Sequence, residues 1–187
     1  MAVRVRYVHR LVFSGALVGL VTLSAHAEVV AESAAGFVSE HELILDADAA
    51  RAFHALTAEV DRWWNAAHSY SGNAENFSLD ARAGGCFCER LDNGGSVEHM
   101  RVVFADPGRL LRLSGGLGPL QGMGATGSMD FAFTPIDATH TRLNYRYAVS
   151  GYAPGGLGPL AQPVDDVQKG QLQRLADYLR QQADTRQ

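Results

Sequence analysis

The chain has 187 residues, of which 47% are hydrophobic, and one domain of this size can bury a full core. Sixteen basic residues stand against 20 acidic ones, with Lys169 as the single lysine and no basic cluster. This balance argues against nucleic acid or an anionic membrane surface as a partner.

Residues 1–27 have the pattern of a secretory signal peptide. Three arginines precede the apolar run 11–23, and a small-x-small cleavage site ends at Ala27. The apolar run is shorter than the about 20 residues that a membrane-spanning helix needs. We therefore expect cleavage, no membrane span in the mature chain, and a periplasmic or secreted protein; an uncleaved anchor is the alternative. Cleavage would leave 13 basic residues against 20 acidic ones, a net charge of −7.

The first part of the mature chain predicts one strand and one helix. Residues 28–36 are expected to form a flexible lead-in, and the alternation over 37–45 predicts the first strand. Asp46 or Asp48 would cap a helix over 49–64, because its apolar side chains share one face. A loop without periodicity follows over 65–76.

From Phe77 onward, short alternating stretches are separated by tight turns, which indicates an antiparallel meander with one apolar and one polar face. The predicted strands are 76–82, 86–91, 96–105, 110–115, 126–134 and 141–151. The string GLGPL occurs at 116–120 and again at 156–160. Because nothing around the two copies matches, we interpret them as two irregular loops and not as an internal repeat.

A long helix follows, with Pro163 in its first turn and an apolar stripe that includes Leu172 and Leu175. This helix is the available partner for the apolar face of the sheet, so the sheet should curl around it. We predict a single α+β domain over 37–183, followed by a polar tail over 184–187. Its curved antiparallel sheet of about six or seven strands would wrap around the C-terminal helix and leave an internal space.

Asn93-Gly94 is a strong signal for a two-residue hairpin loop. The facing pairs would then be Glu89 with Glu98, Phe87 with Met100, Cys88 with His99, and Cys86 with Arg101. Alternation places one set of side chains inward, namely Phe87, Glu89, Glu98, Met100, Val102 and Phe104. The solvent face would carry Cys86, Cys88, Arg90, Val97, His99 and Arg101. A bulge would shift this register by one residue.

Plain structural thiols are the favoured interpretation of Cys86 and Cys88, over a disulfide, a zinc site and a redox pair, which would need two intervening residues and not one. Residues i and i+2 of a regular strand lie about 6.5–7 Å apart at Cα, so a disulfide is disfavoured unless the strand is distorted. A zinc site with His99 lacks a fourth ligand and the usual cysteine spacing. We expect no metal and no cofactor.

Glu89 and Glu98 are the candidate catalytic residues. Opposed carboxylates on an enclosed face repel each other and lose hydration. A shared proton would make them an acid/base pair, whereas a position near the open rim would leave both hydrated. In a binding module, both would belong to the ligand site and orient a polar or cationic group of the ligand.

Aromatic side chains from the helix end and the following loop are candidates for the mouth of a pocket. Trp63 and Trp64 end the helix, and His68 and Tyr70 follow in the loop. Inside, Phe87, Met100, Val102 and Phe104 would line the space together with Met129, Phe131 and Phe133. His41, His54 and His140 fit surface positions, and the serines lack the context of a hydrolytic nucleophile.

Residues 37–180 resemble the START-like, helix-grip superfamily, also called SRPBCC. Within it they are most similar to the branch labelled activator of heat-shock-protein-90 ATPase homologue-like or polyketide cyclase-like. The order and spacing of several stretches carry the resemblance, namely FHALTAEVDRWW, GGCFCER, VVFADPGRLLRLSG and THTRLNYRYAVSG, followed by the terminal helix.

The resemblance implies a helix-grip fold with a pocket between sheet and helix. Members bind lipids, sterols, polyketides, plant hormones or aromatic compounds, and some catalyse cyclisation or dehydration. The superfamily has no universal catalytic residue to carry over. Export would also separate this chain from a cytosolic chaperone ATPase.

We therefore expect an exported module that binds a small, largely apolar or aromatic molecule. One alternative is a cyclase- or dehydratase-like enzyme that uses Glu89 and Glu98. Another is a partner-binding or chaperone-like module, which would need a large apolar patch outside the sheet.

Overall fold

The computed structural model describes residues 27–185, so the predicted signal peptide lies outside the described residues except for Ala27. Eight antiparallel strands form one open sheet in the order β1-β2-β8-β7-β6-β5-β4-β3. The strands are β1 (Ala27–Ser33), β2 (Gly36–Leu45), β3 (Phe77–Leu79), β4 (Cys86–Arg90), β5 (Ser96–Asp106), β6 (Leu110–Ser114), β7 (Thr126–Pro135) and β8 (Thr141–Ser150).

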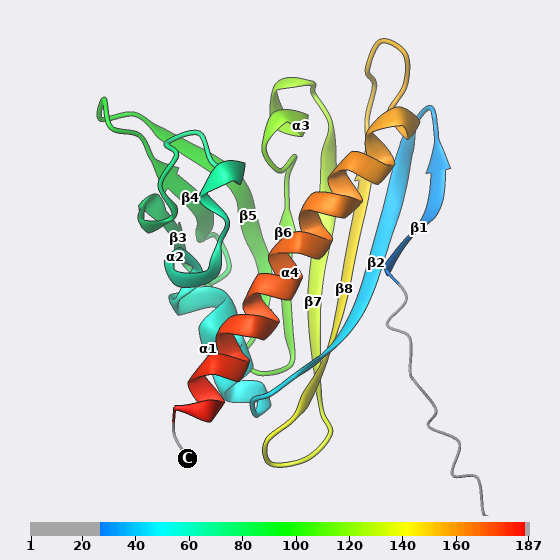
Figure 1. Cartoon of the computed structure of the whole chain (residues 1–187). Coiled ribbons are helices and arrows are strands. Elements are labelled where there is room, and N and C mark those ends of the chain that lie inside the picture. Colours follow the sequence, from blue (N-terminus) through cyan, green and yellow to red (C-terminus); the bar gives the residue numbers. More distant parts are fainter. Residues whose placement is uncertain (1–26, 186–187) are drawn as a thin grey trace, which may run out of the picture.

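The helices are α1 (Ala49–Ala58), α2 (Val60–Trp63), α3 (Pro119–Gly122) and α4 (Ala161–Asp184). The long helix α4 lies across one face of the curved sheet, with α1 and α2 beside its C-terminal half and α3 toward its N-terminal end (Figure 1). This arrangement confirms the predicted α+β helix-grip fold. None of the helices within 27–185 is long and apolar enough to cross a membrane.

Two predicted boundaries are wrong. Residues 27–33 form the edge strand β1, paired with β2, where a flexible lead-in over 28–36 was expected. This strand brings the sheet to eight strands. The helix expected over 49–64 is divided into α1 and α2, because the backbone at Glu59 leaves helical geometry.

The two faces of the sheet differ as the alternation predicts. Along β8, Leu143, Tyr145 and Tyr147 are buried, and they belong to the same core as Leu172 and Leu175 of α4. The outer face carries ion pairs between neighbouring strands, including Arg112–Asp130, Arg142–Glu42 and Arg146–Glu40. The polar pattern on this side therefore reflects cross-strand pairing in solvent.

A buried polar cluster joins α4 to the sheet. The Asp165 carboxylate accepts hydrogen bonds from the Ser39 hydroxyl and from His41 Nε2, the latter at 2.9 Å. All three side chains are buried, so the surface position expected for His41 is wrong. His41 lies on the inward side of β2, in alternation with Phe37 and Ser39. The carboxylate thus attaches the N-terminal half of α4 to β2.

Replacing this carboxylate should destabilise the fold. Asp165→Ala leaves Ser39 and His41 buried without their acceptor, at a cost of about 1–3 kcal/mol for a buried polar group. Asp166 is the matched control, because it is exposed and bonds only to Gln162 on the same helix. Asp166→Ala should change the free energy of unfolding by less than about 0.5 kcal/mol. Equal losses in urea unfolding would contradict the anchoring role.

Candidate functional site

The hydrogen bond that closes the turn between β4 and β5 encloses three residues, 92–94, where two were predicted. Leu91 N donates to Gly95 O, and Gly94, at φ 82°, supplies the left-handed residue that such a loop uses. Pairing next to the loop is therefore shifted by one residue. Glu89 lies opposite Val97, and the predicted pairing of Glu89 with Glu98 is wrong.

A β-bulge at His99 restores the predicted register farther along the hairpin. Cys88 pairs with Glu98 and Phe87 pairs with Met100, so His99 is the extra residue on β5. The pairs Phe87–Met100 and Cys86–Arg101 are as predicted. A bulge interrupts alternation, and His99 and Met100 are consecutive buried residues. The prediction that His99 faces solvent is therefore wrong.

Glu98 lies on the solvent side of β5. It forms an ion pair with Arg101, and 45% of its side-chain surface is exposed. Glu89 is only 1% exposed. The two carboxylates therefore cannot act as the acid/base pair that the expected register implied.

A second bulge explains why Phe104 is outside the core. Val102 pairs with Leu113, but Phe104 pairs with Arg112, so Val103 is the extra residue. Val102 is buried and Phe104 is 46% exposed. The prediction that Phe104 lines an internal pocket is wrong, because the extra residue reverses the alternation.

Cys86 and Cys88 are joined by a disulfide, so the prediction of free thiols is wrong. Their Cα atoms lie 5.4 Å apart, closer than the about 6.5–7 Å of a regular strand. The bulge at His99 of β5 lies opposite this segment, where the register shifts between Phe87 and Cys88. The bonded sulfurs are not available as thiolate zinc ligands.

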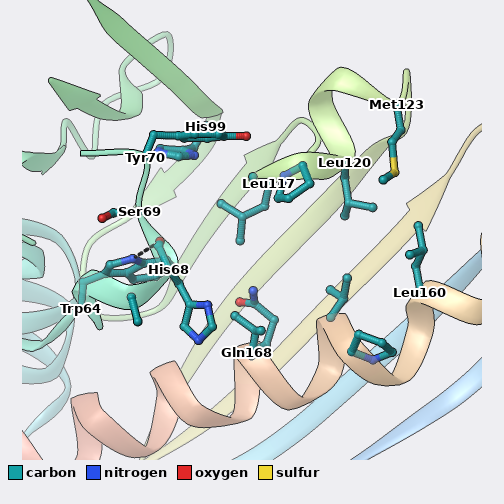
Figure 2. Close-up of a pocket in the computed structure, with 16 residues that line it drawn as sticks. Trp64, His68, Ser69, Tyr70, His99, Leu117, Leu120, Met123, Leu160 and Gln168 are labelled. Carbon is teal, nitrogen blue, oxygen red and sulfur yellow. Dashed lines mark hydrogen bonds between the residues drawn. The ribbon is translucent and has the colours of Figure 1, made fainter. Parts of the chain in front are cut away.

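A pocket of about 390 Å³ opens between the N-terminal part of α4, the loop after α2, and α3 (Figure 2). Most of its lining is apolar. The lining residues are Trp64, Ala67, His68, Ser69, Tyr70, His99, Leu117, Gly118, Pro119, Leu120, Met123, Leu160, Pro163, Val164, Val167 and Gln168.

The structure brings only some of the predicted lining residues to this pocket. Trp64, His68 and Tyr70 line it. A smaller hollow of about 30 Å³ shares Trp64, Leu117 and Gln168 with this pocket. Its walls also include the predicted residues Trp63, Phe87, Met129 and Phe131. Three other residues predicted to face inward are buried in the core and line neither space, namely Met100, Val102 and Phe133. The expected central space is therefore largely filled by side chains.

Sequence reasoning missed the residues of α3 and of the loop before α4. Leu117, Gly118, Pro119 and Leu120 come from the first GLGPL string, and Leu160 comes from the second. Both copies thus contribute to the same pocket. The recurrence of an apolar, glycine- and proline-containing loop was the available signal.

Glu89 and His99 form a buried pair at the edge of the pocket. Glu89 Oε2 accepts from His99 Nε2 at 3.0 Å and from Tyr70 N at 3.1 Å, and Oε1 accepts from Ser71 N at 2.6 Å. Burial by itself would raise the pKa of Glu89, but these hydrogen bonds outweigh it and hold the pKa below its ordinary value. Glu89 is therefore ionised at neutral pH.

The His99 imidazole is neutral at the same pH. Burial lowers its pKa, and the Glu89 carboxylate offsets this only in part. Because Nε2 faces a carboxylate, it carries the ring proton and donates. Nδ1 then has a free lone pair, and it is buried without a hydrogen-bond partner among residues 27–185.

No protein-family model and no curated protein matches the chain, but solved structures share its fold. The Mll3558 protein from Rhizobium loti is 23% identical with a TM-score of 0.56, over 75% of this chain and 94% of that one. CalU16 from Micromonospora echinospora is 15% identical with a TM-score of 0.51, over 78% and 75%. DynU16, from the dynemicin biosynthetic locus, is 17% identical with a TM-score of 0.52, over 76% and 47%. At these identities the likeness concerns the fold.

The two glutamates should respond differently to the same substitution. Glu89→Gln replaces one of the two acceptor oxygens with an NH₂ group, which then faces the backbone N–H of either Ser71 or Tyr70. We expect a loss of about 1–3 kcal/mol in unfolding free energy and faster amide exchange in this loop. Glu98→Gln is the matched control and removes only a surface ion pair, worth about 0–1 kcal/mol. If Glu89→Gln leaves the free energy of unfolding and the amide exchange unchanged, the carboxylate does not hold the loop.

Proposed function

We propose that this protein binds a small, largely apolar or aromatic molecule in the pocket beside α4, as a member of the START-like superfamily. The observation that carries the proposal is the pocket itself. Its volume of about 390 Å³ lies within the about 300–1,000 Å³ of typical ligand sites. Its apolar walls include few polar side chains, chiefly His68, Tyr70, His99 and Gln168, as such sites require.

Two further observations support this assignment. The stretches that resemble the superfamily lie in elements that frame the fold, from α1 to β8. The fold is also shared with DynU16, a protein of a biosynthetic locus. Fold likeness alone is weak support for function, so the pocket carries more of the argument.

We also propose that the protein acts outside the cytoplasm. The pattern of residues 1–27 is typical of a secretory signal. Cys86 and Cys88 are bonded to each other, and disulfides persist mainly in oxidising compartments. A ligand would then be met in the periplasm or the medium.

Binding is favoured over the two alternative functions. Glu89 is surrounded by three donors from the protein, and Glu98 lies on the other face of the sheet. An acid/base mechanism shared by these two residues therefore has no geometric support. The outer face carries ion pairs across its central strands, which disfavours a chaperone-like apolar surface there.

Filling the pocket should abolish binding while the fold persists. Val164 is half-buried and lines the pocket, so Val164→Trp should weaken binding of the neutral aromatic probe N-phenyl-1-naphthylamine at least about tenfold. Val103→Trp is the matched control, because Val103 is exposed on the outer side of β5. Probe fluorescence measures both affinities, and circular dichroism checks folding.

Two outcomes would contradict the proposal. One is probe binding by Val164→Trp that equals binding by the wild type. The other combines two negative results. The wild type does not bind the probe, and mass spectrometry finds no co-purifying apolar molecule in denatured extracts of protein purified from its native host.

A further inference from the structure

The polar groups around the pocket differ in whether they already have hydrogen-bond partners within the protein. Trp64 Nε1 donates to His68 O at 3.0 Å (dashed line in Figure 2). The Ser69 hydroxyl donates to Ala66 O and accepts from Gly72 N. These groups are already engaged in holding the loop. They have little capacity left for a ligand.

His99 is different because one of its two nitrogens lacks a partner. Its side chain is 3% exposed and Nε2 is engaged by Glu89, whereas Nδ1 is buried and unpaired within the described part of the chain. A buried acceptor without a donor is costly, about 1–3 kcal/mol, and such groups are rare in native structures. Since His99 also lines the pocket, a molecule bound there can supply the missing donor.

Tyr70 covers the imidazole on the loop side. Its ring is nearly parallel to that of His99, at 18° and 5.9 Å between centroids, and Phe77 and Phe87 also pack against His99. Of these three rings, Tyr70 is 56% exposed and the other two are buried. Tyr70 is therefore the one of these three rings that can move aside without disturbing the core.

We infer that His99 Nδ1 accepts a hydrogen bond from a ligand in the pocket, and that this ligand is a neutral apolar or aromatic molecule bearing an O–H or N–H donor. This inference depends on the proposed binding function. The ionised Glu89 fixes the proton on Nε2, so Nδ1 can accept but cannot donate. An ether or carbonyl oxygen of a ligand would place its lone pair against the lone pair of Nδ1. A carboxylate would in addition be repelled by Glu89.

A pair of probes of similar shape isolates this hydrogen bond. 2-Naphthol and 2-methylnaphthalene differ by a hydroxyl in place of a methyl group, and both affinities can be measured by displacement of N-phenyl-1-naphthylamine. His99→Phe keeps an aromatic ring between Tyr70 and Phe77 but removes the acceptor. The affinity ratio of naphthol to methylnaphthalene should fall about tenfold in this variant, the size of one such bond.

Two control variants separate His99 from its neighbours. Tyr70→Phe retains the covering ring without its hydroxyl, and Gln168→Met removes the amide that lines the pocket from α4 (Figure 2). Because both residues line the pocket, either variant can change the affinity for both probes, but the ratio of the two affinities should stay closer to the wild-type value than in His99→Phe. A ratio that changes with Gln168→Met and not with His99→Phe would overturn the inference. An unchanged ratio in all variants would overturn it as well, while leaving the proposed binding function intact.

A measurement on the wild-type protein covers the case in which His99→Phe does not fold. In a crystal structure with 2-naphthol, the ligand oxygen should lie within about 3.2 Å of His99 Nδ1. An oxygen bonded to Gln168 or facing solvent would overturn the assignment. Failure of the wild type to bind either naphthalene or the displaced probe would overturn both the inference and the proposed function.

Discussion

The ionised Glu89 carboxylate is the constraint on which the candidate site depends. It is buried on β4, and its charge is stabilised by two backbone amides of the loop after α2 and by the imidazole of His99. Three separate pieces of chain therefore meet at one carboxyl group. Removing the charge would release the loop that carries Tyr70. The proton of His99 would then no longer be held on Nε2.

Asp165 has the corresponding role on the other side of the pocket. It fixes the start of α4 to β2 through Ser39 and His41, and the neighbouring residues Val164 and Gln168 line the pocket. Two walls of the pocket, the loop after α2 and the helix α4, are thus each held by a buried carboxylate. Buried charges that are well satisfied specify geometry at some cost in stability, which is consistent with a preformed site.

The sequence predicted the regular parts of this molecule and missed the irregular ones. The alternation along 141–151 and the apolar stripe of 161–184 were sufficient to predict a sheet packed around a helix. Burial of one face enforces a two-residue period in a strand and a 3.6-residue period in a helix. Loop length and bulges leave no comparable mark: Asp92-Asn93-Gly94 forms a three-residue loop, and His99 and Val103 are extra residues. Each shift of one residue reverses the faces, so Glu98, His99 and Phe104 were assigned to the wrong sides.

The bulge on β5 turns a neutral His99 toward an ionised Glu89, with the proton on Nε2. Nitrogen-15 NMR of the imidazole in the unliganded wild-type protein at neutral pH tests this directly, because the two ring nitrogens differ in shift according to which one is protonated. The account predicts a protonated Nε2 and an unprotonated Nδ1 for His99. A proton on Nδ1, or an imidazolium with both nitrogens protonated, would contradict it.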